Sequence, residues 1–249
     1  MPRSYSERAY LTDGYFKDDT VASRPVDERL AFIRRTYLTL TMSIIALIGM
    51  EALLLTAIEK PAGKQFMLQW FASPVSILVV LALFIGGGFL ARYMARAAMP
   101  PAVKYLGLAL YTGIQALFLL PIIYISTMKY GLSIVNEAAL LTFVVFAGLT
   151  LTVFLTKKDF SFLGGIISIA SWSLLGILLV AILIPGSFGV GLWFSFAFVA
   201  LAAAAILYNT SNVLHHYHPS EHVGAALELL ADVVLLFYHI LRILYLTRE

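Results

Sequence analysis

Seven apolar stretches alternate with short polar segments along the chain. Each is about 20 residues or longer, which is the length of helix that crosses a ~30 Å hydrocarbon core. The pattern therefore predicts an all-α membrane protein, a seven-transmembrane-helix bundle formed by residues 30–249. The predicted spans are Thr36–Ile58, Phe71–Ala91, Tyr105–Thr127, Ile134–Thr156, Ser161–Ile184, Gly189–Val213 and Val223–Leu246.

The first 29 residues are polar and carry charges of both signs. A segment with so few apolar residues buries too little surface to fold by itself. Residues 1–29 are therefore expected to form a mobile tail, which becomes an amphipathic lead-in as the first span approaches. No secretory signal opens the chain, and no second domain fits into the short loops.

Composition supports a membrane location and narrows the chemistry. Hydrophobic residues make up 61% of the chain and charged residues only 12%, against about 25% charged residues in soluble domains. The chain has no cysteine, which excludes disulfides and thiolate chemistry. No HExxH, Gly-x-Ser-x-Gly or Walker motif is present. We expect the protein to lie in a lipid bilayer. We expect no enzymatic activity, no cofactor and no nucleic-acid partner.

The distribution of Lys and Arg predicts the orientation. Of the 17 Lys and Arg residues, 12 lie in the amino-terminal tail and in the loops on the same side of the membrane. Cytoplasmic loops carry the excess of such residues. The amino terminus is therefore expected in the cytoplasm and the carboxy terminus outside. The compact chain without an added domain favours a bacterial cytoplasmic membrane.

The last span is apolar enough for a bilayer, yet it carries Glu228, Asp232, His239 and Arg242. At 100° per residue, Glu228, Asp232 and His239 share one stripe of the helix, and Arg242 lies about 80° from Asp232. Ionisable groups inside a membrane are costly and usually mark an ion path, a proton relay or a buried pair. We therefore expect the seventh helix to be central, with its polar stripe facing the other helices.

Two further groups could complete this site. Arg92 ends the second span, where it could anchor the helix at the cytoplasmic surface or pair with Asp232 or Glu228. The run from Asn209 to Asn212 near the end of the sixth span could line a cavity, or it could satisfy the open carbonyls of the helix end.

Several motifs resemble the transmembrane Bax-inhibitor-motif family. ILYNTSNVLHHY and ALELLADVVLLFYHILRIL resemble the family's last two helices, FLTKKDFSFLGG its turn between spans four and five, and FIRRTYLTL its entry to span one. The resemblance covers about Asp27 to Leu246. It implies a pH-sensitive calcium leak, in which two aspartates of spans six and seven share a proton and an arginine at the end of span two takes part in gating.

Asp232 matches the second aspartate of that family and Arg92 is the best match for the arginine, whereas Asn209 stands in place of the first aspartate. An asparagine cannot share the proton, so we expect weaker pH dependence here than in two-aspartate relatives. Glu228 could replace the missing acid, but it lies on span seven instead of six.

The leading hypothesis is a passive leak of calcium, or of protons, through a polar interior centred on Asp232. Carboxylate and amide oxygens suit calcium, so Asp232 is its expected ligand, with Glu228 and Asn209 beside it, Arg92 as gating partner, and His239 and Arg242 as accessory residues. The alternative is a non-conducting regulatory protein that binds membrane proteases or other membrane partners.

Overall fold

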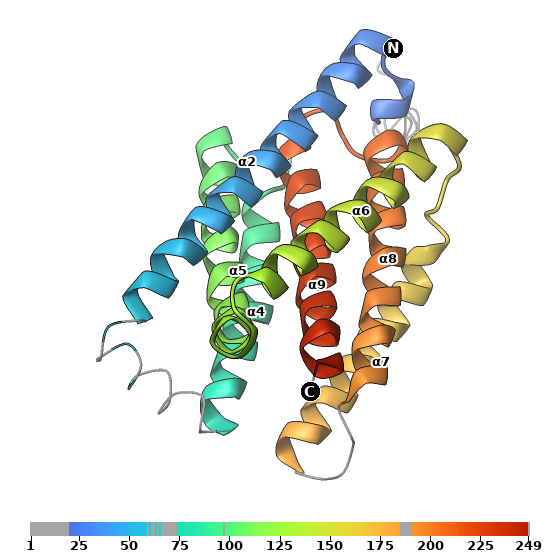
Figure 1. Ribbon diagram of the computed structural model, residues 1–249. Helices are drawn as coiled ribbons and strands as arrows, with labels where there is room; N and C mark the ends of the chain where they lie inside the picture. Colours follow the sequence, from blue (N-terminus) through green and yellow to red (C-terminus); the bar gives the residue numbers. More distant parts are fainter. Residues whose placement is uncertain are drawn as a thin grey trace, which may run out of the picture.

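A computed structural model describes residues 20–58, 60, 63, 65, 74–96, 98–184 and 191–248 (Figure 1). Apart from loops and turns, these residues are helical, and they contain no β-strand. The elements are a 3₁₀ helix, η1 (Val21–Ser23), and seven α-helices: α2 (Val26–Ile58), α4 (Pro74–Met94), α5 (Pro101–Tyr130), α6 (Ser133–Thr156), α7 (Leu163–Leu183), α8 (Leu192–His215) and α9 (His222–Thr247).

Six of the described helices are long and apolar enough to cross a membrane, namely α2 and α5 to α9. In α4 the apolar part is shorter and runs from Leu78 to Met94. Each predicted span overlaps one helix, although the ends differ, and the predicted starts at Phe71 and Gly189 lie outside the described residues. The helix of the first span begins at Val26, ten residues before Thr36, because the amphipathic lead-in continues the same helix.

Most of the predicted tail, residues 1–19, lies outside the described residues. From residue 20 the chain is ordered against the helices. Val21 in η1 is buried, and its backbone N–H donates to the carbonyl oxygen of Tyr217 at 2.9 Å. The entry to the first helix is thereby attached to the α8–α9 connection.

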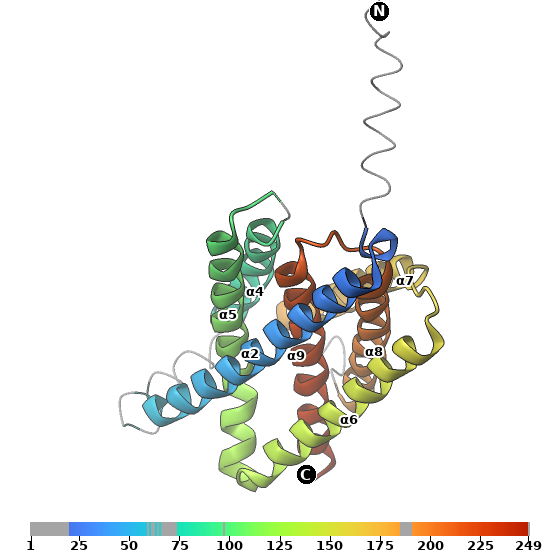
Figure 2. The same ribbon diagram turned by 90° about the horizontal axis from the view of Figure 1, so that it is seen from above.

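The last helix, α9, packs against α2, α5, α6 and α8. Figures 1 and 2 show α9 between the α4–α5 pair on one side and the α7–α8 pair on the other, with α2 and α6 crossing it. The core follows from this arrangement, since the largest fully buried side chains include six from α9: Val223, Leu227, Leu229, Leu230, Leu236 and Leu241. By contrast, α7 contributes no buried residue.

Close contact between α4 and α5 sets the position of the end of α4. A Cβ atom at Gly107 of α5 would lie 2.8 Å from the Met94 Cβ and 3.3 Å from the Ala91 carbonyl oxygen. Only a residue without a side chain allows the two backbones to approach this far. Arg92 lies between these two contact points in the sequence, so its place follows from the packing of α4 on α5.

The amino ends of α2, α5 and α9 and the carboxy ends of α4, α6 and α8 lie at the same end of the bundle, the upper end in Figure 1. Arg92, Arg96, Lys104, Lys157 and Lys158 belong to these helix ends or follow them directly. The described basic residues that the sequence analysis assigns to one side therefore gather at one end of the molecule.

Candidate functional site

A cavity of about 680 Å³ lies between α4, α5, α7, α8 and α9. Its wall is largely apolar and includes Tyr111, Tyr217 and a row of phenylalanines. All six residues predicted from the sequence line this one cavity: Arg92, Asn209, Glu228, Asp232, His239 and Arg242. The structure therefore brings together side chains from α4, α8 and α9.

Arg92 and Glu228 form a two-pronged ion pair between α4 and α9. The Nε of Arg92 donates to Oε1 of Glu228 at 2.7 Å, and its Nη2 donates to Oε2 at 3.0 Å. This is the bidentate geometry in which a guanidinium binds a carboxylate most strongly. The two side chains are 44% and 27% exposed. Of the two acids proposed from the sequence as partners of Arg92, Glu228 is the one that it contacts.

Asp232 lies one turn further along α9 and is bound to α8. The Nδ2 of Asn209 donates to Oδ2 of Asp232 at 2.7 Å, and both residues are buried, at 9% and 7% exposure. A buried carboxylate needs a donor to offset the loss of water, and this amide supplies one. Asn209 of α8 thus faces Asp232 of α9 and binds it directly.

A second, smaller cavity of about 130 Å³ lies beside the ion pair. Arg92, Glu228 and Tyr217 line both cavities, while Arg96 and Glu221 line only the smaller one. The residues of the smaller cavity come from the carboxy end of α4 and the residues directly after it, from the α8–α9 connection, and from the amino end of α9. The Arg92–Glu228 pair therefore lies between the large cavity and the basic end of the bundle.

His239 and Arg242 lie on the opposite side of Asp232 from the ion pair. The ring of His239 is 4% exposed and stacks on Phe198 of α8, with ring centroids 4.3 Å apart and planes 5° apart. The guanidinium of Arg242 lies over the ring of Phe194, 5.9 Å from its centroid. Both predicted accessory residues are thus packed among aromatic rings of α8, not beside the carboxylates.

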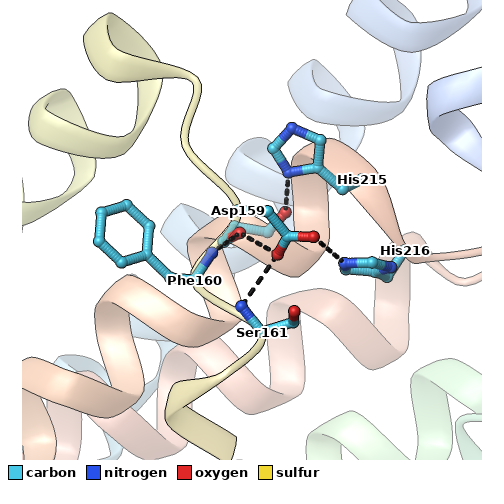
Figure 3. A network of polar contacts seen from close by, with 6 residues as sticks. Asp159, Phe160, Ser161, His215 and His216 are labelled. Atoms are coloured by element: carbon cyan, nitrogen blue, oxygen red, sulfur yellow. Dashed lines mark hydrogen bonds and ion pairs between the residues drawn. The ribbon is translucent and has the colours of Figure 1, made fainter.

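Ser211, two residues beyond Asn209, faces away from this cavity toward the loop between α6 and α7. Its Oγ accepts the backbone N–H of Phe160 at 2.9 Å and lies 3.4 Å from Oδ1 of Asp159. The second carboxylate oxygen of Asp159 lies 3.0 Å from Nε2 of His216, as Figure 3 shows. The polar run at the end of α8 thus has two faces: Asn209 and Asn212 line the large cavity, and Ser211 binds the α6–α7 loop.

This loop network is the clearest electrostatic feature outside the spans. The backbone N–H of Ser161 donates to Oδ1 of Asp159 at 2.9 Å. Together with the contact to His216, this hydrogen bond lowers the pKa of Asp159 from 3.8 to about 2. A carboxylate that accepts such hydrogen bonds is favoured in its charged form. Asp159 is therefore a stable anion that connects the α6–α7 loop to the end of α8.

Several cavity residues were not singled out from the sequence. They are aromatic: Phe84, Tyr111, Phe118, Phe194, Phe198, Tyr208, Tyr217 and Tyr238. Such residues are ordinary in membrane helices, so no single position stands out. Two of them directly precede a predicted site residue: Tyr238 precedes His239, and Tyr208 precedes Asn209. This proximity in the chain is the signal that the sequence offers for them.

Among the described residues, no group of three or more His, Cys, Asp or Glu side chains is placed to hold a metal ion. Asp232 and Glu228 are the two carboxylates that line the large cavity, beside amide and hydroxyl oxygens such as those of Asn209 and Tyr217, and the Glu228 carboxylate is engaged by Arg92. A calcium ion takes six to eight oxygen ligands. Water would have to supply most of the ligands of an ion at Asp232.

Comparison with known proteins identifies the family of the chain. The family described as Inhibitor of apoptosis-promoting Bax1 matches residues 29–249. The chain is 30% identical to Bax inhibitor 1 of Schizosaccharomyces pombe over 253 residues, 98% of this chain and 89% of the relative. It is 28% identical to the Golgi anti-apoptotic protein of vaccinia virus, over 100% of this chain and 99% of that protein.

A mouse relative, Protein lifeguard 4, is 29% identical over 245 residues, 95% of this chain and 94% of its own length. The family match and these relatives each extend over nearly the whole helical domain, including α4, α8 and α9. The protein is thus an integral membrane protein of the Bax inhibitor family.

Proposed function

We propose that this protein is a gated leak for cations, with calcium as the main ion, and that the path passes Asp232. The Arg92–Glu228 pair supports this most directly. It lies between the smaller cavity at the basic end of the bundle and the large cavity that contains Asp232. Separation of the two side chains would join the cavities and release a second carboxylate into the path.

Charge balance explains how such a release would favour a cation. With the pair formed, the Arg92 charge neutralises Glu228, and Asp232 is held by the Asn209 amide. Once Arg92 moves away, Glu228 and Asp232 stand one helical turn apart without the charge of Arg92 beside them. Two such carboxylates repel each other unless a cation or a proton is shared between them.

The proposal includes the membrane arrangement. All seven helices α2 and α4 to α9 span the bilayer, with α9 at the centre and its polar stripe turned inward. The basic end of the bundle lies in the cytoplasm and the carboxy terminus lies outside. A bacterial cytoplasmic membrane is the location we propose, and bacterial relatives such as a protein of Pseudomonas aeruginosa, 32% identical over 68% of this chain, are in keeping with it.

Calcium flux into liposomes that contain only the purified protein tests the proposal. We expect measurable flux with the natural chain and several-fold faster flux with Arg92→Ala, because the ion pair no longer closes the path. Glu228→Gln also breaks the pair but removes a carboxylate from the path. It should therefore increase flux less than Arg92→Ala does.

Arg35→Ala is the matched control, because Arg35 is an exposed arginine of α2 at the same end of the bundle. It removes the same charge without touching the cavity, so its flux should equal that of the natural chain. Loss of the pair should also lower the free energy of unfolding. The expected decrease is at least ~1 kcal/mol, the value for an exposed pair, and at most ~3–5 kcal/mol, the value for a buried one. Unchanged flux and unchanged melting in Arg92→Ala would reduce Arg92 to an anchor of α4.

The second candidate is a non-conducting regulator of membrane partners. The names of two relatives, Bax inhibitor 1 and Golgi anti-apoptotic protein, describe regulatory roles for those proteins. In this chain Asn209 replaces an acid in the cavity, which weakens the case for ion passage. Absence of calcium flux from pH 5 to 8 in the natural chain and in Arg92→Ala alike would favour the regulator.

A further inference from the structure

Six aromatic rings form a continuous chain of contacts across four helices. Phe84 of α4 contacts Phe118 of α5, with centroids 4.6 Å apart, and Phe118 contacts Tyr238 of α9 at 4.9 Å. Tyr238 meets His239 at 4.9 Å, which stacks on Phe198 of α8 at 4.3 Å, and Phe198 meets Phe194 at 4.9 Å. We call these six residues the aromatic layer.

The aromatic layer lies on the far side of Asp232 from the Arg92–Glu228 pair. On α9, Tyr238 and His239 follow Asp232 by six and seven residues, which is about 10 Å along a helix. On α8, Phe198 lies three turns from Asn209 in the same direction. An ion that leaves Asp232 toward the carboxy-terminal end of α9 must therefore pass at the depth of these rings.

The rings belong to the wall of the large cavity and are not sealed in the core. All six line the cavity, and the five other than His239 are partly exposed. They come from α4 and α8 on its two sides and from α5 and α9 between them. An apolar constriction holds no continuous water and thereby stops hydrated ions. Rings from four different helices are suited to form one.

His239 is the member that departs from apolar packing. Its ring lies flat on Phe198 with 5° between the planes, and its Nδ1 atom is buried without a hydrogen bond. A buried imidazole nitrogen with no partner is a cost that simple core packing would avoid. Arg242, one turn further out, extends the contact by lying over Phe194. The guanidinium of Arg242 thus continues the stack at the outer end of the cavity.

We propose that the aromatic layer is a second barrier, in series with the Arg92–Glu228 pair. Its rings line the cavity between Asp232 and the outer end at Arg242 and keep that stretch free of continuous water, so that the chamber around Asp232 has one barrier on each side. The stack of His239 on Phe198 is the contact that opens when an ion passes outward. This inference rests on the proposed cation path for its meaning. Its central claim, closure of the chamber on the side of the α9 carboxy terminus, is measurable without any flux.

Thiol labelling measures that closure, because the chain contains no cysteine of its own. Ala231→Cys places a single thiol in the large cavity beside Asp232. A positively charged, membrane-impermeant methanethiosulfonate is added from the side of the α9 carboxy terminus. We expect slow labelling with the layer intact and at least about tenfold faster labelling after Phe198→Ala, since removal of the ring opens the constriction.

Phe196→Ala is the matched control, because Phe196 is an exposed phenylalanine of α8 two residues before Phe198 that does not line the cavity. It should leave labelling slow. Thr247→Cys, exposed at the end of α9, should label fast in every background. Phe198→Leu keeps the apolar volume and removes the ring, so it gives the same test with less disturbance of folding.

Fast labelling of Ala231→Cys with the layer intact, at the rate seen in Phe198→Ala, would overturn the second barrier. The same conclusion would follow if Phe198→Ala and Phe198→Leu both left labelling slow. If the layer variants change labelling but no variant passes calcium, the barrier stands and the proposed leak fails. If Arg92→Ala passes calcium, and the double variant with Phe198→Ala passes it at the same rate, the leak stands and the second barrier fails.

Discussion

Asn209 and Asp232 form an amide–carboxylate pair where the resemblance to the family leads one to expect two aspartates. The amide donates a hydrogen bond to the carboxylate at 2.7 Å, so the contact between α8 and α9 needs no shared proton. With two carboxylates at this distance, a single proton would hold the pair together and its loss would drive them apart. With an amide at position 209, the contact at the centre of the cavity therefore does not depend on a proton.

We predict that Asn209→Asp makes calcium flux depend more steeply on pH. Across pH 5 to 8, flux through the variant should change by about tenfold more than flux through the natural chain, which corresponds to ~1.4 kcal/mol of coupling to one proton. The low-pH form should be the slower one, because a shared proton keeps α8 and α9 in contact. Flux into liposomes at fixed calcium, measured against pH, gives the comparison.

Asn212→Asp is the matched control, since Asn212 lines the same cavity but is not hydrogen-bonded to Asp232 among the described contacts. It introduces the same acid without rebuilding the pair and should leave the pH profile close to the natural one. A steep natural profile that Asn209→Asp leaves unchanged and Glu228→Gln abolishes would place the pH sensor on α9 instead.

At the scale of the elements, the connection between α6 and α7 is attached to the end of α8. Lys157 ends α6 in a left-handed conformation, with φ of 52°, and the chain then turns toward α8. Ser211 and His216 of the α8 end hold Asp159 and the Phe160 backbone (Figure 3). Because Asn209 lies two residues before Ser211, the loop and the cavity share one rigid helix end.

We predict that this connection loses stability in acid. The pKa of Asp159 is lowered from 3.8 to about 2 in the folded protein. A lowered carboxyl pKa contributes stability that is present above the unfolded value and is lost as pH falls through the folded value. The loss therefore falls between about pH 4 and pH 2. Thermal unfolding of the detergent-solubilised protein should show it, and Asp159→Asn should flatten this part of the profile.

The size of that effect is limited by exposure, since Asp159 and His216 are each 46% exposed. Solvent screening leaves an exposed pair at most about 1 kcal/mol, or roughly 2–4 °C in melting temperature for a chain of this size. Glu137→Gln is a suitable control, because Glu137 is paired with Arg248 at the other end of the bundle. An Asp159→Asn profile parallel to the natural one down to pH 2 would contradict the assignment.

At the scale of the whole molecule, charge and hydrophobicity divide the bundle along its axis. The described basic residues at the ends of α4, α5 and α6 gather at one end, together with the smaller cavity and the Arg92–Glu228 pair. The aromatic layer lies toward the opposite end. The two barriers that we propose, one electrostatic and one apolar, therefore lie along the same axis as the predicted orientation.

We predict that Lys158→Cys, in the α6–α7 loop, is labelled by an impermeant maleimide only after cells are permeabilised. Leu132→Cys, between α5 and α6, should be labelled in intact cells. Both positions are exposed, and the cysteine-free parent chain supplies the background. We expect the basic end in the cytoplasm, because cytoplasmic loops carry the excess of Lys and Arg. The reverse labelling pattern would invert the proposed topology.

Local sequence patterns predict the helices and identify the polar residues that line the cavity. Hydropathy and helical period depend on residues close together in the chain, so each of the seven spans overlaps a helix. The same period placed Glu228, Asp232 and His239 on one stripe of α9, and all three line the large cavity. Helix ends were less certain, because an amphipathic lead-in such as the one before Thr36 can continue a helix beyond the bilayer.

The tertiary structure alone decided which of these residues meet. Arg92 could have paired with Asp232 or Glu228, and the choice of Glu228 depends on how α4 packs on α5 and how α9 is rotated between its neighbours. The paired residues are 136 positions apart, so no local pattern reports their contact. The aromatic layer was equally hidden, because its rings come from four helices and each is ordinary in its own span. Which side chains face one another across a bundle is set by helix crossing and rotation, and these follow from packing over the whole molecule.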